Sequence, residues 1–186
     1  GVNIDYSLPY SENGEIGIGA SYEYSPDNYY IDYDTLNGEV YVKDIMRSFT
    51  REVGTNEYDV YLTVQQKWGN FVLKPGIRME YERLWSNIAG YETVNQTNEY
   101  LNWRPSIHLS YRTKSMHNFS LSYSRRIAPP GARDITSFKF YSTESFATGN
   151  PDLLPTYTNS VEGGWTKYWN RFGSVGLTAY YRDSRN

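Results

Sequence analysis

The stretch LNWRPSIHLSYRTKSMHNFSLSYSRR, residues 101–126, decides the fold because its side chains separate by parity. Apolar residues take alternate positions of its first half, beginning with Leu101 and Trp103, and polar or charged residues fill the positions between them. Successive side chains of a strand point to opposite faces of a sheet. After a short polar break the alternation restarts with Phe119 and Leu121. The stretch therefore predicts an antiparallel hairpin of two long strands.

The length of the first strand indicates a membrane. Its apolar alternation covers about eleven residues, whereas strands of water-soluble proteins average ~5–6. A tilted strand needs ~9–11 residues to cross a bilayer. No apolar run of ~18 residues exists, so a membrane-spanning helix is excluded.

The composition agrees with a wall that meets lipid on one face and water on the other. The mean hydropathy is −0.69, a value that such a two-faced wall averages to. Aromatic residues make up 17% of the 186 residues, with 20 Tyr and 5 Trp, as in the girdles of membrane barrels or in carbohydrate-binding β-proteins. A net charge of −3 shows no basic field for nucleic acid, and no Cys is available for disulfides or thiolate metal sites.

The same alternation recurs along the chain and predicts eight strands joined by alternately short and long connections. The long polar connections are expected at residues 25–56, where strand extensions should project above the membrane, and at 86–100 and 127–157. The last of these holds four of the eight prolines. Pro75 and Pro105 fall inside predicted strands, where each needs a bulge or a position that donates no hydrogen bond. The fold class is therefore all-β, an antiparallel up-and-down transmembrane β-barrel wall.

Several motifs resemble the outer-membrane β-barrel family of TonB-dependent receptors, as found in Bacteroidota. They are YSRRI at residues 123–127 followed by Pro130, then GNPDLLP at 149–155, with similar stretches GIRMEYE and PSIHLSY at 76–82 and 105–111. The motif residues are Arg125, Arg126, Pro130, Gly149, Asn150, Pro151 and Pro155.

The resemblance implies that residues 1–186 are part of a single β-barrel domain, eight strands of a larger barrel of roughly 22. The signal peptide and the plug domain would then lie outside this chain. The resemblance further implies a place in the outer membrane of a Gram-negative cell and contact with its lipid. It also implies coupling to the TonB complex through the plug, and a surface lipoprotein as a further partner.

Charged residues gather on the polar faces of two strands that should pair. The candidates for a lumen-facing ladder are Lys74, Arg78, Glu80, Glu82, Arg104, His108 and Arg112. They would line a substrate path or contact the plug. Alternatively, they form cross-strand ion pairs that hold the wall together.

Catalytic and metal-binding patterns are weak. Glu80 and Glu82 lie on one strand, with no indication of the pocket that a paired-carboxylate mechanism needs. Only His108 and His117 are present, and Asp27, Asp32 and Asp34 fit no calcium-loop spacing. We therefore expect no enzyme, no metal and no cofactor.

Aromatic residues of the long connections are the candidates for contact with an extracellular ligand. They are Tyr29, Tyr30, Tyr33, Phe138, Phe140, Tyr141 and Phe146. They would stack on sugars or other flat ligands, or else pack the bases of the loops together.

Three functions remain open at this point. The first is the resemblance's implication, an outer-membrane receptor that takes up an extracellular ligand with energy supplied through TonB. The second is a self-contained eight-stranded barrel with a structural or adhesion role, which requires the first and last strands to pair. The third is a soluble β-sheet module that binds glycans.

Overall fold

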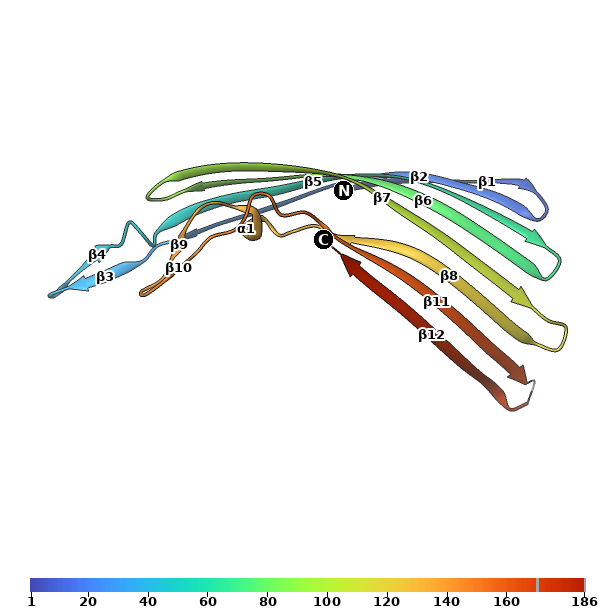
Figure 1. Cartoon of the computed structure of the whole chain (residues 1–186). Helices are drawn as coiled ribbons and strands as arrows, with labels where there is room; N and C mark the ends of the chain where they lie inside the picture. The colour runs from blue at the N-terminus through green and yellow to red at the C-terminus, as the bar shows by residue number, and fades with distance from the viewer. Residues whose placement is uncertain (170, 186) are drawn as a thin grey trace.

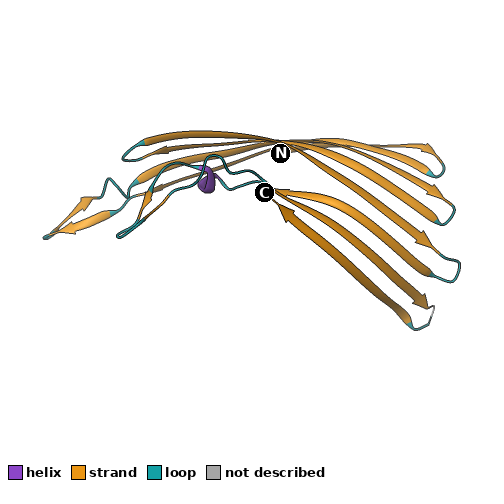
Figure 2. Cartoon of the chain, in the orientation of Figure 1, coloured by secondary structure: helices purple, strands orange, loops and turns teal. Residues whose placement is uncertain are grey.

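The computed structural model describes residues 1–169 and 171–185, and these form one long antiparallel sheet with little else (Figures 1 and 2). Its eight strands are β1 (Val2–Ser11), β2 (Gly14–Ile31), β5 (Phe49–Trp68), β6 (Phe71–Ala89), β7 (Thr93–Arg112), β8 (His117–Ala128), β11 (Thr156–Trp169) and β12 (Gly173–Arg185). They lie side by side in chain order. The connections carry β3 (Asp34–Asn37), β4 (Val40–Lys43), α1 (Ala132–Ile135), β9 (Phe140–Tyr141) and β10 (Phe146–Ala147). The all-β antiparallel prediction is confirmed.

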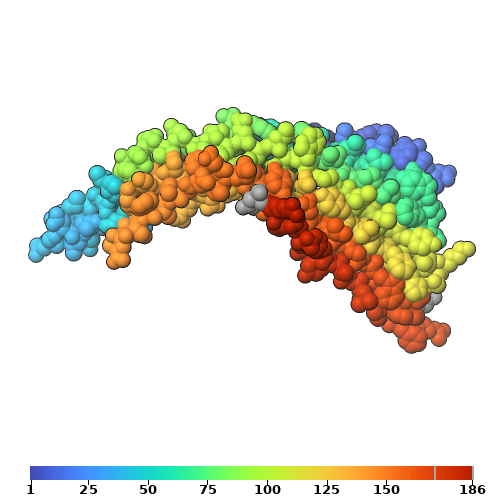
Figure 3. Space-filling view, in the orientation of Figure 1, coloured from blue at the N-terminus to red at the C-terminus, as the bar shows by residue number. Residues whose placement is uncertain are grey.

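The sheet curves into an arch whose two faces differ in chemistry (Figures 1 and 3). Large apolar side chains project from the convex face, where Leu101 and Trp103 keep 57% and 50% of their surfaces exposed. Between them, Asn102 points to the concave face and is 1% exposed. A water-soluble protein buries its large apolar side chains, whereas this sheet exposes them on its convex face. This is expected for a wall with lipid outside and water inside. Among the described residues, no helix is both long and apolar enough to cross a membrane.

The central strands are longer than a membrane crossing requires. β2, β5, β6 and β7 contain 18, 20, 19 and 20 residues, against the ~9–11 that a tilted strand needs. The pairing of β2 with β5 continues to Ile31 opposite Phe49, which confirms the predicted strand extensions within residues 25–56. One end of the sheet carries tight turns, such as that at Gly69, whose φ is +57°. The other end carries the long connections (Figure 1).

The predicted polar loop at residues 86–100 is wrong. β6 continues to Ala89 and β7 begins at Thr93, so the connection is only residues 90–92, closed by a bond from the Gly90 amide to the Glu92 carbonyl at 3.0 Å. Residues 93–99 are nearly all polar, so the sequence shows no alternation of apolar and polar residues that would indicate a strand there. Backbone pairing with β6, from Leu84 opposite Asn98 outward, makes the segment a strand. The short–long order of connections therefore fails at this point.

Both strand prolines interrupt pairing, as expected of residues without an N–H to donate. Pro75 pairs with Ile107 of β7, but the β5–β6 ladder skips it while keeping its register on both sides. Pro105 lies beside the point where β7 and β8 separate. Their pairing ends at Ser106 opposite Ser124, although β7 continues along β6 and β8 continues along β11. The two strands thus form a fork.

The segment between β8 and β11 folds back under the concave face near the long-connection end (Figures 1 and 3). Ile135 of α1 packs against Val53 of β5 and Leu84 of β6, with Ala132 and Leu153 beside them. This small apolar cluster is the part of the described molecule that resembles a conventional core. It fixes the returning segment against the sheet.

Strands β1 and β12 form the two edges of the sheet. The pairing between them that a self-contained barrel requires is absent from the described part of the chain. Unpaired backbone groups at an edge are costly in a bilayer, so both edges need a partner strand there.

Candidate ligand-binding surfaces

The predicted charge ladder lies on the concave face, across the paired strands β6 and β7. The register places Arg78 directly opposite Arg104, and Glu80 opposite Asn102. Like charges that face each other are unfavourable. The ion pair forms diagonally instead, where Arg104 Nη1 donates to Glu80 Oε2 at 2.6 Å. The Glu80 side chain is only 6% exposed, whereas the Arg104 side chain keeps 31% of its surface exposed, so the pair is partly removed from water.

A group of carboxylates surrounds that pair. Glu57, Asp59 and Glu80 bring carboxylate oxygens within 4.8 Å of one another, and Glu82 lies opposite Glu57. Sequence reasoning overlooked Glu57 and Asp59, although the same parity applied to residues 57–68 places them on the polar face. The trio is close enough to hold a cation, but Arg104 bonds to Glu80 and Arg78 lies 3.9 Å from Asp59. The group is therefore better described as a charge network that arginines partly neutralise.

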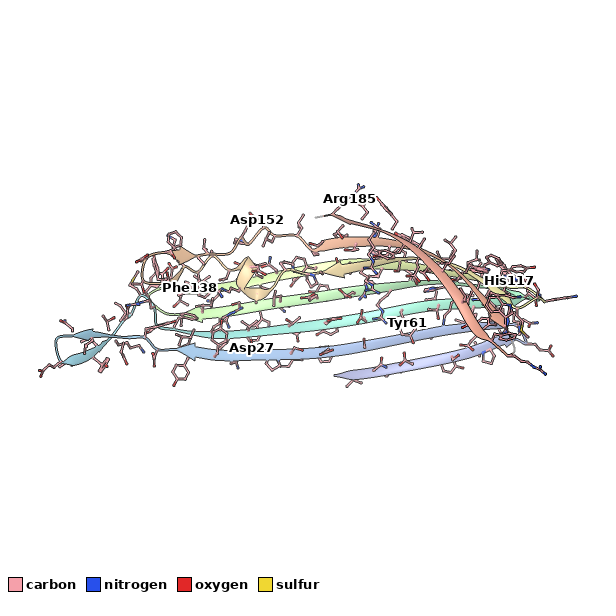
Figure 4. All side chains as sticks on the ribbon, turned by 90° about the horizontal axis from the view of Figure 1, so that it is seen from below. Asp27, Tyr61, His117, Phe138, Asp152 and Arg185 are labelled. Carbon is pink, nitrogen blue, oxygen red and sulfur yellow. The ribbon has the colours of Figure 1, made fainter. Side chains whose placement is uncertain are left out.

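The remaining members of the ladder lie toward the tight-turn end. Lys74 is opposite His108, and Arg112 is opposite Asn118 at the end of β7. His117 begins β8 and accepts a bond at Nδ1 from Trp165 Nε1 at 3.0 Å. Figure 4 shows His117 at this end, Tyr61 in mid-sheet and Phe138 toward the opposite end.

A cavity of about 430 Å³ opens beside the fork between β7 and β8. Arg78 and Arg104 reach it from β6 and β7, and the motif residues Arg125 and Arg126 reach it from β8. His108 lines it as well. Three of the predicted ladder residues and two of the motif residues therefore meet at one place.

Aromatic side chains gather at the long-connection end of the sheet. Phe49 lies 6.3 Å from Tyr29, 5.6 Å from Phe138 and 5.3 Å from Phe140, measured between ring centroids. Tyr91 joins Phe138 at 5.2 Å, and desolvation, followed by its bond to Glu92, raises the pKa of its phenol. Sequence reasoning missed Phe49 and Tyr91, because both lie well away from the tyrosine-rich run at residues 27–35 that supplied the candidates of the first connection.

A second cavity, of about 370 Å³, opens beside this cluster. Its lining includes Tyr29, Tyr33, Phe49, Phe140, Tyr141, Phe146 and Arg133. Arg133 lies over the Phe140 ring with 5.1 Å from guanidinium carbon to centroid. Five of the seven predicted aromatic candidates thus share one cavity.

The other two aromatic candidates lie elsewhere. Phe138 is 1% exposed and packs between Phe49 and Phe140. Tyr30 is 71% exposed and borders a different hollow, with Asp32 and Lys43. Tyr29 and Tyr30 also belong to β2 rather than to a loop, because pairing with β5 extends the strand past them.

The comparison with protein families agrees with this geometry. The family model described as Outer membrane protein beta-barrel family matches residues 1–186. The chain belongs to this outer-membrane β-barrel family. The comparison with curated proteins found no match. Membership indicates the outer membrane as the location, and the convex apolar face is then the surface that contacts lipid.

In this outer-membrane barrel chain, the motif GNPDLLP has a structural role. The Gly149 amide donates to the Thr136 carbonyl at 2.8 Å, and the Asn150 amide donates to the Asp134 carbonyl at 2.6 Å. The carbonyl of Pro151 accepts from Asn98 Nδ2 at 2.9 Å, which ties the motif to β7. Pro155 is buried just before β11. The motif therefore anchors the returning segment under the sheet and supports one wall of the aromatic cavity.

Proposed function

We propose that this chain forms part of the barrel wall and the outward-facing ligand contacts of a TonB-dependent receptor, which takes up an extracellular ligand. The observation that carries the proposal is the aromatic cavity at the long-connection end, above a concave face that stays polar down to the tight turns. Outer-membrane barrels place short turns in the periplasm and long connections outside the cell. That orientation puts the cavity where an external ligand arrives.

The cavity wall suits a ligand with flat or ring-shaped apolar faces, such as a sugar. Tyr141 and Phe146 lie 5.8 Å apart between centroids at its border, with Ser142 and Ser145 beside them as hydroxyl donors. Aromatic faces contribute about 0.5–1.5 kcal/mol per ring contact beyond buried area. Hydroxyl and guanidinium donors at the rim then orient the ligand.

The open sheet supports a barrel larger than eight strands. β1 and β12 are edges whose backbone groups need partner strands within a bilayer. Receptors of this kind pass energy from the TonB complex to a plug inside the barrel, and a surface lipoprotein can cover the outer face. On this proposal the chain catalyses no reaction and needs no cofactor, and its direct contacts are lipid, plug and ligand.

Uptake by cells tests the proposal. A strain that lacks the gene, complemented with native or variant protein, is grown on a panel of oligosaccharides and iron complexes as sole nutrient sources. We expect growth on at least one source to require both the gene and TonB. Phe146→Ala should slow that growth at limiting nutrient about threefold to tenfold, because one ring contact is lost.

Tyr30→Ala is the matched control, because Tyr30 is an exposed aromatic residue near the same end but outside the cavity. It should leave growth unchanged. Growth that is independent of TonB on every source would contradict energy-coupled uptake. A self-contained barrel with a structural or adhesion role would then be the better account.

A further inference from the structure

The cavity at the fork between β7 and β8 is lined by four arginines and one histidine from three strands. Arg78 comes from β6, Arg104 and His108 from β7, and Arg125 and Arg126 from β8. Its lining in the described chain includes no carboxylate. The fork exists because pairing ends at Ser106 opposite Ser124, next to Pro105, which has no N–H to donate. The backbone thus opens beside a cavity whose lining includes four arginines.

Two of these four arginines have a carboxylate partner, and the other two have none in the described part of the chain. Arg104 pairs with Glu80 at 2.6 Å, and Arg78 lies 3.9 Å from Asp59 and 5.5 Å over the Tyr61 ring. Arg125 and Arg126 form no ion pair among the described residues.

The two β8 arginines differ in how firmly they are held. The Nε of Arg125 donates to Asn159 Oδ1 at 3.0 Å, and its guanidinium lies over the Tyr157 ring at 6.0 Å. Arg126 is exposed, and no hydrogen bond, ion pair or ring contact engages its side chain in the part of the chain that the structure describes. Arg125 is therefore positioned in advance, and Arg126 is free to close on a ligand.

The chemistry of the lining selects an anion. A guanidinium group presents a planar fork of donors that matches a carboxylate or a phosphate with two parallel bonds. Ser106, Ser124 and Thr63 add hydroxyl donors to the same wall. The volume of about 430 Å³ accommodates a small molecule with more than one anionic group.

We propose that this cavity is an anion-binding site on the water-facing wall, which holds the carboxylate or phosphate groups of a small polyanion. The site requires only that the concave face meets water, so it does not depend on energy-coupled uptake. Its ligand chemistry also differs from that of the aromatic cavity at the long-connection end.

Calorimetry on the full-length protein in detergent tests the site. Citrate and pyrophosphate are titrated separately at low ionic strength, with acetate as a monovalent reference. We expect citrate or pyrophosphate to bind at least tenfold more tightly than acetate, because more than one arginine is engaged. Whichever of the two binds more tightly identifies the group that the cavity prefers.

Two variants locate the binding. Arg126→Gln should weaken binding of the preferred anion about tenfold. The double variant Arg78→Gln/Arg126→Gln should weaken binding further. Arg112→Gln is the matched control, because it removes the same charge from the neighbouring strand β7, outside the cavity. It should change binding less than twofold.

Because Arg126 is exposed, its substitution should not disturb folding. Circular dichroism of each variant checks that the β-sheet content is unchanged. The proposal is overturned if the native protein binds neither polyanion. It is also overturned if Arg126→Gln and Arg112→Gln weaken binding equally, since the effect would then reflect net charge alone.

Discussion

Arg104 has two roles on the concave face. Its guanidinium neutralises Glu80 within a group of four carboxylates, and it also lines the cavity at the fork. Pairing between β6 and β7 fixes both contacts, because Arg104 stands opposite Arg78 and can reach Glu80 only along the diagonal. Structural and binding roles therefore meet in one side chain.

Loss of this arginine should destabilise the wall. Arg104→Met leaves Glu80 without its counter-charge, and removal of one partner of a buried pair costs about 3 kcal/mol. The double variant Arg104→Met/Glu80→Met should return to within about 1 kcal/mol of the native protein, because an apolar pair removes the uncompensated charge. Urea unfolding in lipid vesicles, followed by tryptophan fluorescence, measures both values. Equal destabilisation by the single and double variants would show that the pair is not the reason.

Asp44 gives the connection between β4 and β5 a dependence on acid. A bond from Arg47 Nε at 2.6 Å, together with the amides of Met46 and Arg47, holds the pKa of Asp44 below its ordinary value of 3.8. A lowered pKa means that the stabilisation is complete above pH 3.8 and is lost as the pH falls through the folded-state pKa. Hydrogen exchange of the Ser48 amide, which donates to the Asp44 carbonyl at 2.9 Å, should report this loss.

Asp44→Asn is the comparison for that measurement. The variant cannot titrate at this position, so protection of the Ser48 amide should no longer change in the acid range. Identical acid profiles for the native and Asp44→Asn proteins would contradict the assignment. The expected change lies in the connection and not in the sheet.

At the scale of elements, the segment between β8 and β11 depends on Gly149. A Cβ added there would collide with the Asp134 carbonyl group, so Gly149→Ala must displace either α1 or the motif. We expect trypsin to cleave at Arg133 and Lys139 about tenfold faster in this variant. Gly163→Ala is the control, because a Cβ at Gly163 in β11 meets nothing within 4 Å. Equal cleavage rates for the two variants would show that the segment does not depend on this close approach.

The elements also show where sequence reasoning works and where it fails. The alternation of apolar and polar residues, as at Leu101 and Asn102, located all eight strands of the sheet. It failed at residues 93–99, because a strand that projects beyond the lipid is polar on both faces and only pairing reveals it. Parity also placed the ladder on one face, but it could not supply the register, so the Arg78–Arg104 opposition and the contribution of Asp59 were missed.

Convergence between distant elements was the least predictable part of the candidate sites. The aromatic run near Tyr29 was evident from composition, but Tyr29 and Phe140 both pack on Phe49 only because the segment after β8 folds back beneath the sheet. The fork between β7 and β8 likewise depends on how far two strands pair. The sequence indicated Pro105 as an irregularity without showing that Arg125 and Arg126 would meet Arg78 there.

At the scale of the whole molecule, the sheet has a convex face that meets lipid and a concave face that meets water. Both candidate sites lie on the concave side or at its outer end, and they have a function only if that side is open to solvent. The apolar residues of the convex face are otherwise unexplained, since Trp103 and Leu101 stay exposed. Both candidate sites therefore depend on the orientation of the two faces.

Spin-label scanning along β7 measures this orientation, and the 186 residues contain no native cysteine to interfere with labelling. Single cysteines from position 101 to 112 are labelled in the protein reconstituted in lipid vesicles. Collision with oxygen, which concentrates in lipid, is compared with collision with a water-soluble nickel complex. We expect strict alternation, with labels at Trp103 and Ile107 favouring oxygen and labels at His108 and Ser110 favouring nickel. Equal access of nickel to both sets would contradict a wall with one lipid-facing and one water-facing surface.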